Sequence, residues 1–513
     1  MTAVLKNSGV SPRSDRVSGS ELIAAGFALT LLAVLTGLYT LHGGFILYYG
    51  DAQAHLNISR SIIDSRTPGY DQLGTVWLPL LHLLCLPLSA VDSLWSTGLA
   101  GTIPVGACFV IAGLLLYSAA KAIYCETRAA TVVLACFALN PNLLYFASIP
   151  MTEVVFLAGL TAMLYAMIRF RQNNRGREFW LGVGASWWMS LTRYDGWFLI
   201  PFSALWFGFW AKRNRGLTLV AFGILAALAP AYWIAHNWYE TGNALDFYNG
   251  PYSASAIQGS NSYPGYHDWK LAISYYAEAG RLCAGLCLSL LGLAGLILSG
   301  RKDAFLPVVF LLLPPLFYIW SIHSSNVPVF VPRLSPHSYY NIRYGIVLIV
   351  WAAFASGALV TALPIRWRKL TLALPLLALC PWILHPVKEN VICWKESQVN
   401  SVARRAWTTP AANFFRSHYT PGQGIIAPFG DLIGVFCYAK IPLKDVLHIG
   451  NGPEWFATTS RPDLVHRELW AMAQHGDALS NSLQKRKTSP YELVRSIEVP
   501  KAQALLIFRK ENK

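Results

Sequence analysis

Charged side chains are scarce in this sequence of 513 residues. Only 13% of the residues are Asp, Glu, Lys or Arg, roughly half of the ~25% that is typical of soluble globular domains. This scarcity excludes an ordinary soluble enzyme. The nine cysteines lack metal-ligand spacing, and most lie in apolar segments where Cys acts as a small hydrophobe. Only Cys393 and Cys437, in the polar C-terminal part, are candidates for a disulfide.

Apolar residues are abundant instead, at 54% of the chain. A transmembrane helix needs about 20 mainly apolar residues, and such stretches recur up to about residue 390. The sequence therefore predicts an all-α polytopic membrane protein with about eleven transmembrane helices. The expected spans are Leu22–Leu41, Gly98–Ile123, Ala129–Ser148, Val154–Phe170, Phe179–Leu191, Trp197–Trp210, Leu217–Trp238, Arg281–Leu298, Phe305–Ile322, Ile342–Leu363 and Leu370–Leu384.

The net charge of +15 reflects membrane orientation, since cytoplasmic loops carry an excess of Lys and Arg. No nucleic-acid partner is predicted. The loops expected in the cytoplasm carry Lys6, Arg13, Arg16, Lys121, Arg128, Arg169, Arg171, Arg175, Arg177, Lys212, Arg213, Arg215, Arg301, Lys302, Arg366, Arg368 and Lys369. The opposite loops carry Asp51, Asp64, Asp71, Glu153, Asp195, Asp246 and Asp268. The chemistry is therefore expected on the extracytoplasmic side.

Three parts are expected along the chain. Residues 1–20 form a cytoplasmic tail, residues 21–390 form the transmembrane domain with outer loops 43–97 and 239–280, and residues 391–513 form a small extracytoplasmic α/β domain. Short apolar runs at Gly424–Phe429 and Ala504–Phe508 suggest strands, and Pro462–Gln474 suggests a helix.

Asp51 follows the first span and opens a short amphipathic helix. It is equally compatible with a helix N-cap and with a general base at the membrane surface. His55 and Arg60 lie further along the same helix. The following apolar stretch, Gly74–Pro87, contains two prolines and suits an interfacial segment better than a span.

Three other polar sites lie where spans are expected to reach the outer surface. Glu153 sits in the first turn of a span, where the helix dipole favours an acid, but an acid entering the bilayer is also a functional candidate. Arg193 and Asp195 lie two residues apart in a short hairpin, and an internal ion pair is the structural alternative. Arg343, before Tyr344, either snorkels to the interface or binds a phosphate.

The outer segment Tyr239–Glu278 is rich in Tyr, Gly and Pro. This composition suits a mobile lid over a sugar or lipid, and it equally suits an interfacial aromatic belt.

Together these features resemble the GT-C superfamily of membrane glycosyltransferases that use polyprenyl-phosphate sugars, especially the protein O-mannosyltransferase and lipid A aminoarabinose transferase branch. The resemblance covers Leu22 to Leu384 by topology. It is carried by Asp51 with Arg60-Ser61, the Trp77–Leu84 interfacial helix, Asn140-Pro141 with Thr152-Glu153, Thr192–Gly196, and Arg343-Tyr344. The second acid usual in the family is Ala52 here, and the lysine expected near Gly74-Thr75 is absent.

The resemblance implies inverting transfer of a sugar from a polyprenyl-phosphate donor to a hydroxyl of a lipid, glycan or protein acceptor. Because the donor already has a good leaving group, one base is sufficient, and Asp51 is the expected base. Arg343, then Arg193, and further Arg60, Lys270 and Arg281 are the expected phosphate ligands. Glu153, Asp195, His55 and Tyr344 are expected to orient these groups or to contact the sugar or acceptor. No tightly bound metal or cofactor is expected, and a loosely bound divalent cation is left open.

A transporter or flippase of lipid-linked sugars is the main alternative, because it would also have many spans and buried charges. No inverted repeat is visible, however, and the acids lie near one surface. A membrane-embedded assembly partner with a binding C-terminal domain is a third possibility. The resemblance favours a bacterial inner membrane with the active site facing the periplasm. The sequence specifies neither the sugar nor the acceptor.

Overall fold

The computed structural model describes residues 17–259, 261–300, 303–462, 467–485, 489–500 and 502–510. Five residues of the expected cytoplasmic positive charge, Lys6, Arg13, Arg16, Arg301 and Lys302, lie outside the described residues. Positions 463–466 of the helix expected over Pro462–Gln474 also lie outside them.

Seven helical segments in the described chain are long and apolar enough to cross a membrane, and a bent pair of helices could make an eighth. The seven are α1 (Gly19–His42), α5 (Leu99–Tyr124), α8 (Thr152–Asn173), α11 (Arg215–Thr241), α16 and α17 (Phe305–Phe310 and Leu313–Ser324), η2 and α18 (Ile342–Ile346 and Val347–Ala362), and η3 and α19 (Ile365–Ala373 and Leu374–Leu384). The protein is therefore an integral membrane protein. The expected number of eleven spans is not confirmed.

The difference in number has local causes. The α9 and α10 helices (Gly176–Ser190 and Asp195–Trp210) have 15 and 16 residues, so each is roughly 22–24 Å long, short of a ~30 Å hydrocarbon core. The span expected over Ala129–Ser148 is broken, because α6 (Thr127–Ala138) ends before Asn140 caps α7 (Pro141–Phe146).

The span expected over Arg281–Leu298 is bent. There α14 (Trp269–Ala284) and α15 (Leu286–Ser299) meet at 108°. Gly285 joins them with a φ of +84°, a conformation that residues other than glycine rarely adopt. The bend also means that the outer segment Tyr239–Glu278 is no single loop, since α12 (Asp246–Asn249), α13 (Ala254–Gln258) and most of α14 lie within it.

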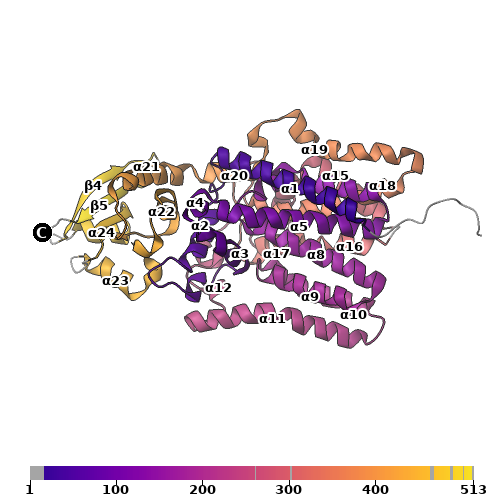
Figure 1. Ribbon diagram of the computed structural model, residues 1–513, viewed down its shortest axis with the longest axis horizontal. Helices are drawn as coiled ribbons and strands as arrows, with labels where there is room; N and C mark the ends of the chain where they lie inside the picture. The colour runs from indigo at the N-terminus through magenta and orange to yellow at the C-terminus, as the bar shows by residue number, and fades with distance from the viewer. Residues whose placement is uncertain are drawn as a thin grey trace, which may run out of the picture.

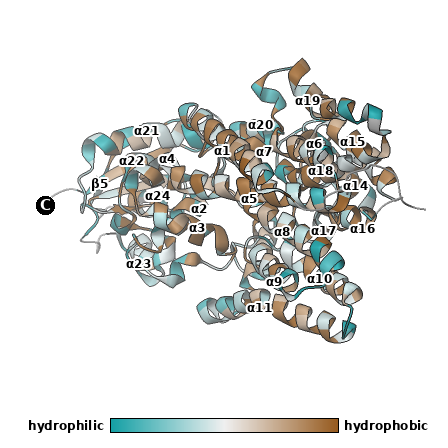
Figure 2. Cartoon of the chain, turned by 45° about the vertical axis from the view of Figure 1, so that its right-hand side comes forward, coloured by the Kyte–Doolittle hydropathy of each residue, from teal (hydrophilic) through white to brown (hydrophobic). Residues whose placement is uncertain are grey.

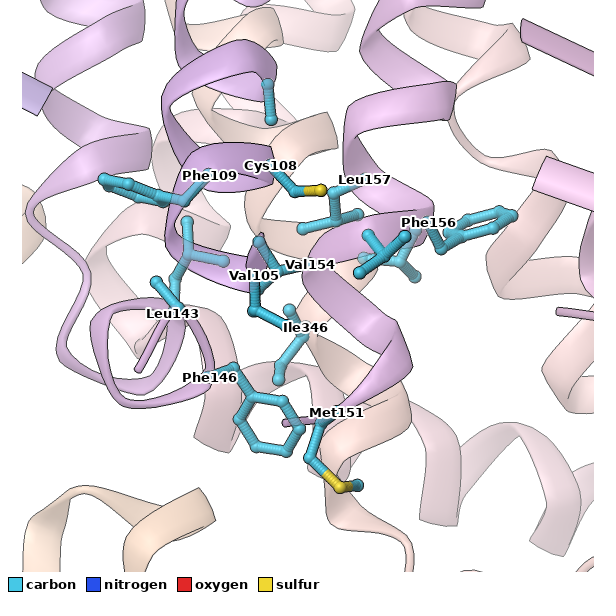
Figure 3. Packing of buried hydrophobic residues seen from close by; sticks show 14 of the residues in the cluster. Val105, Cys108, Phe109, Leu143, Phe146, Met151, Val154, Phe156, Leu157 and Ile346 are labelled. Carbon is cyan, nitrogen blue, oxygen red and sulfur yellow. The ribbon is translucent and has the colours of Figure 1, made fainter. Parts of the chain in front are cut away.

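The bundle is held together by close helix contacts around buried apolar side chains. Figure 3 shows Val105 of α5 next to Val154 of α8, with Ile346 near them. Where α15 meets α18, small residues let the backbones approach, as is common between membrane helices. A Cβ atom added at Gly295 would lie 2.2 Å from the Ala355 carbonyl oxygen.

Short helices cover the end of the bundle next to the C-terminal part: α2 (Gly50–Ser61), η1 (Tyr70–Leu73), α3 (Leu80–Ser89) and α4 (Asp92–Thr97). A helix is present where the interfacial helix is expected, but it begins at Leu80 instead of Trp77. Its ten residues are too few to cross a bilayer.

The C-terminal part forms a small mixed sheet with helices. Its helices are α20 (Ile392–Asn400), α21 (Val402–His418), α22 (Ile433–Ala439), α23 (Pro453–Ser460) and α24 (Ala478–Lys485). The strands β1 (Ile425–Ile426), β2 (Val446–Leu447), β3 (Trp470–Gln474), β4 (Tyr491–Ile497) and β5 (Leu505–Lys510) lie in the order β2-β1-β3-β5-β4. β1 pairs in parallel with β2 and β3, and the other pairs are antiparallel. Residues 470–474, expected in a helix, are a strand because burial on both faces removes the alternating pattern.

The C-terminal part packs directly on these short helices (Figure 1). Arg404 of α21 donates to the Tyr48 carbonyl oxygen, and Arg66 pairs with Glu454 and Glu468. Figure 2 shows brown apolar stretches over α1 and α5 and more hydrophilic stretches over α21 and α23.

The disulfide considered between Cys393 and Cys437 is wrong, because neither of these two cysteines is in a disulfide. Cys393 lies with its Sγ 3.7 Å from that of Cys283, while Cys437 donates to the Trp95 carbonyl oxygen.

The close contact of α15 and α18 gives a stability prediction. We expect Gly295→Ala to lower the thermal unfolding midpoint in detergent, because overpacking against a backbone carbonyl costs about 1–3 kcal/mol. Gly184→Ala is the matched control, since it adds the same atom to α9 where nothing lies within 4 Å. Equal midpoints for the two variants would contradict this packing.

Candidate functional site

Asp51 lies in the first turn of α2, at the end of the bundle next to the C-terminal part. The N-cap of this helix is Tyr49, whose backbone is extended, so the alternative that Asp51 is the N-cap is wrong. The Asp51 carboxylate accepts a hydrogen bond from Arg343 Nη2 at 2.6 Å. Its side chain is 36% exposed, so this carboxylate is accessible from outside the bundle.

Arg343 lies in η2, immediately before α18. Asn341, at φ +55°, turns the chain into η2, which directs Arg343 toward the start of α2. Its Nε lies 3.2 Å from Glu153 Oε1 while its Nη2 holds Asp51. One guanidinium therefore joins two acids from helices more than a hundred residues apart.

Arg193 binds the same glutamate from the turn between α9 and α10. Its Nη1 donates to Thr152 Oγ1 at 2.8 Å and to Glu153 Oε1 at 3.1 Å. Its Nε lies 3.3 Å from Asp195 Oδ1. Glu153 Oε1 is thus shared by two arginines. We call Asp51, Glu153, Arg193, Asp195 and Arg343 the ionic cluster.

Tyrosines enclose the inner side of the ionic cluster. Tyr318 donates its hydroxyl to Asp195 Oδ2 at 2.6 Å and stacks on Tyr344 with ring centroids 4.7 Å apart. The Tyr344 ring lies 5.3 Å from the Arg193 guanidinium and 5.7 Å from that of Arg343. Aromatic faces at these distances attract cations, so Tyr344 contributes to holding both arginines.

Three of the expected phosphate ligands lie elsewhere. Arg60 is bound to Asp64 and Asp92, each at 2.7 Å, and to the carbonyl oxygens of Ser89 and Ala90. It therefore fastens α2 to α3 and α4. Lys270 is exposed in the first turn of α14. Arg281, also considered, pairs with Glu278 three residues earlier at 2.6 Å.

His55 is buried against His82, with His55 Nδ1 2.9 Å from His82 Nε2 and the Trp77 ring beside it. Burial and the nearby guanidiniums of Arg343 and Arg193 lower the pKa of His55 to about 3. His55 is therefore neutral at physiological pH and supplies no positive charge for an anion. It forms part of the wall next to the ionic cluster.

Sequence reasoning missed Tyr318 and Glu396. Glu396 of α20 is 1% exposed and lies beside Arg343. Burial raises its pKa to about 7, against the opposing effect of the Arg343 guanidinium and of hydrogen bonds from the backbone at Asn341 and Arg343. No sequence signal distinguishes it, because a Glu next to Lys395 in a polar helix is typical of a solvated surface.

Around Gly74-Thr75, where the expected lysine is absent, Thr75 donates to Asp246 at 2.6 Å.

Within the described ranges no group of three or more His, Cys, Asp or Glu side chains is arranged to hold a metal ion. The carboxylates of the ionic cluster have guanidiniums as neighbours instead.

No family model matches this chain, and no curated protein matches it by sequence. Two crystal structures of ArnT from Cupriavidus metallidurans, one bound to undecaprenyl phosphate and one in the apo state, match it at 12% identity. Each match covers 92% of this chain and 97% of ArnT, with TM-scores of 0.56 and 0.54. The likeness extends through the C-terminal part and confirms the GT-C type of fold expected from the sequence.

The position of Glu153 between two arginines gives a prediction about the stability of the protein. We expect Glu153→Gln to destabilise the protein by about 3 kcal/mol, because removal of one partner from a buried ion pair leaves the other charge uncompensated. Thermal unfolding in detergent at pH 7 measures the effect, with the exposed Glu389→Gln as the control. If the two variants unfold together, the two arginines do not depend on Glu153.

Proposed function

We propose that the chain is an inverting membrane glycosyltransferase that moves a sugar from a polyprenyl-phosphate donor to an acceptor hydroxyl. The observation that carries the proposal is the ionic cluster. In it the accessible carboxylate of Asp51 is paired with Arg343, which lies next to a second guanidinium, that of Arg193. The GT-C type of fold supports it, since ArnT, which shares the fold, has been crystallised bound to undecaprenyl phosphate.

Asp51 is the proposed base. Its side chain is 36% exposed, whereas those of Glu153 and Asp195 are 5% and 2% exposed. Among these three acids, only Asp51 can meet the hydroxyl of a bulky acceptor. It would take the hydroxyl proton as the oxygen attacks the anomeric carbon from the face opposite the phosphate, which inverts the configuration.

Arg343 is the proposed principal ligand of the donor phosphate, and Arg193 the second. Phosphate and guanidinium form charge-assisted, often bidentate hydrogen bonds. Because Arg343 Nη2 pairs with Asp51, a phosphate that binds Arg343 competes with this carboxylate. Donor binding would then release Asp51 next to the anomeric carbon, so that the base becomes free when the sugar arrives.

The remaining members of the ionic cluster act on the two arginines. Glu153 holds them side by side, and Asp195 holds Arg193 through its Nε. Tyr344 covers both guanidiniums. As the phosphate leaves with its electron pair, the arginines meet the charge that develops on it, and fixed cations are most effective for this.

We further propose that the ionic cluster faces the periplasm of a bacterial inner membrane, with the basic loops in the cytoplasm. The described basic residues Arg169 and Arg171 lie at the end of α8, opposite to Glu153 in its first turn. This separation of charge follows the positive-inside rule.

The geometry favours an enzyme over a transporter of lipid-linked sugars. Transporter sites lie near the bilayer midplane between repeats. Here the ionic cluster lies at the starts of α2, α8, α10 and α18, at the end of the bundle next to the C-terminal part.

Replacement of the proposed base tests the mechanism. We expect Asp51→Asn to lower kcat for sugar transfer by about 10²–10⁴-fold, because the amide cannot accept the proton. The assay measures release of polyprenyl phosphate by purified protein in nanodiscs with a panel of polyprenyl-phosphate monosaccharides. Asp71→Asn, in an exposed position of the same outer segment, should retain transfer. Near-full activity of Asp51→Asn in a folded protein would disprove the assignment.

Replacement of the proposed phosphate ligand tests donor binding. We expect Arg343→Gln to raise KM for the donor at least ten-fold, since a charge-assisted hydrogen bond contributes about 1.5–3 kcal/mol. Lys270→Gln, which removes an exposed cation outside the ionic cluster, should leave KM unchanged. The opposite pattern would place the donor phosphate at α14.

A further inference from the structure

Glu396 connects the C-terminal part to the ionic cluster. It lies on α20, the first regular helix after α19, and is 1% exposed. The start of α2 binds the same helix, because the Tyr49 hydroxyl donates to the Cys393 carbonyl oxygen at 2.9 Å. Glu396 is therefore a buried carboxyl group in the wall that α20 adds to the site.

The carboxyl group holds the backbone that carries Arg343. It accepts hydrogen bonds from the backbone at Asn341 and Arg343, the residues that begin η2. In the described chain its Oε2 has no hydrogen-bond partner although this atom is buried. Burial of an unsatisfied carboxylate oxygen is costly, so a proton on Glu396 relieves an unfavourable charge.

The groups that face Glu396 do not balance a negative charge there. Arg343 from η2 is the nearby cation, and its guanidinium is already paired with Asp51 and Glu153. The other titratable neighbours are neutral or acidic: Tyr49 before α2, Tyr145 of α7, Glu153 of α8, Tyr340 before η2, Cys393 of α20 and, beyond it, Cys283 of α14. An ionised Glu396 is thus a third carboxylate around one guanidinium.

We propose that Glu396 is a positioning residue whose protonation state sets how strongly Arg343 holds the donor phosphate. This role rests on the function proposed above. When Glu396 is neutral, the phosphate competes for Arg343 with two carboxylates, those of Asp51 and Glu153. With Glu396 ionised, a third carboxylate competes and repels the incoming anion.

The sign of the pH dependence follows from the charges. An anion bound to Arg343 disfavours a second negative charge beside it, so donor binding favours protonated Glu396. Because burial raises the pKa of Glu396 to about 7, the free protein loses this proton between about pH 6 and pH 8. Donor binding above pH 7 must then take up a proton, and affinity falls as the pH rises.

The test measures calorimetric binding of a polyprenyl phosphosugar to the full-length protein in nanodiscs from pH 6 to pH 9. The ligand is a phosphodiester, whose single negative charge is constant over this range. In the wild type and in the exposed control Glu389→Gln we expect Kd to rise about ten-fold, which corresponds to a pKa of Glu396 that is higher by about 1 in the complex. In Glu396→Gln the amide keeps the acceptor oxygen, and Kd should be constant with pH.

A second measurement needs no variant. Binding to the wild type at pH 8, repeated in buffers of different ionisation enthalpy, should show net proton uptake. Constant affinity and no proton uptake in the wild type, or unchanged pH dependence in a folded Glu396→Gln, overturns the role of Glu396. Failure of the wild type to bind any donor at any pH disproves the proposed function itself and this role with it.

Discussion

The carboxylate oxygen of Glu153 shared by Arg193 and Arg343 is the interaction on which the site depends. Its Oε1 lies 3.1 Å from one guanidinium and 3.2 Å from the other. Two cations in a medium of low dielectric repel each other strongly, and a buried acid between them offsets this repulsion. Glu153 therefore fixes two guanidiniums side by side at one place in the bundle.

The fold supplies this arrangement by bringing helix starts together. Glu153 and Asp195 lie in the first turns of α8 and α10, where the helix dipole favours acids. Arg193 precedes α10, and Arg343 precedes α18. The C-terminal part closes the same end through α20 and α21, which explains why a buried acid on α20 can act on Arg343. In this account Arg343 exchanges partners, from Asp51 to a phosphate, and the exchange frees the base.

The sequence predicts the members of the ionic cluster well, because each lies where a span is expected to reach the outer surface. It could not predict that Asp92 also binds Arg60, since that contact depends on how α2 packs on α4. The contact of His55 with His82 could not be predicted either, because it depends on how α2 packs on α3. Glu396 was missed because burial by a distant helix leaves no local pattern. The breaks within two of the expected spans were missed because hydropathy does not register the bend at Gly285 or the cap at Asn140.

A structure of the protein with a bound polyprenyl phosphosugar tests the central claim most directly. Our account predicts the phosphate on the Arg343 and Arg193 guanidiniums, with Asp51 released from Arg343 and facing the anomeric carbon. A phosphate bound away from both arginines, with the Asp51–Arg343 pair intact, would contradict it.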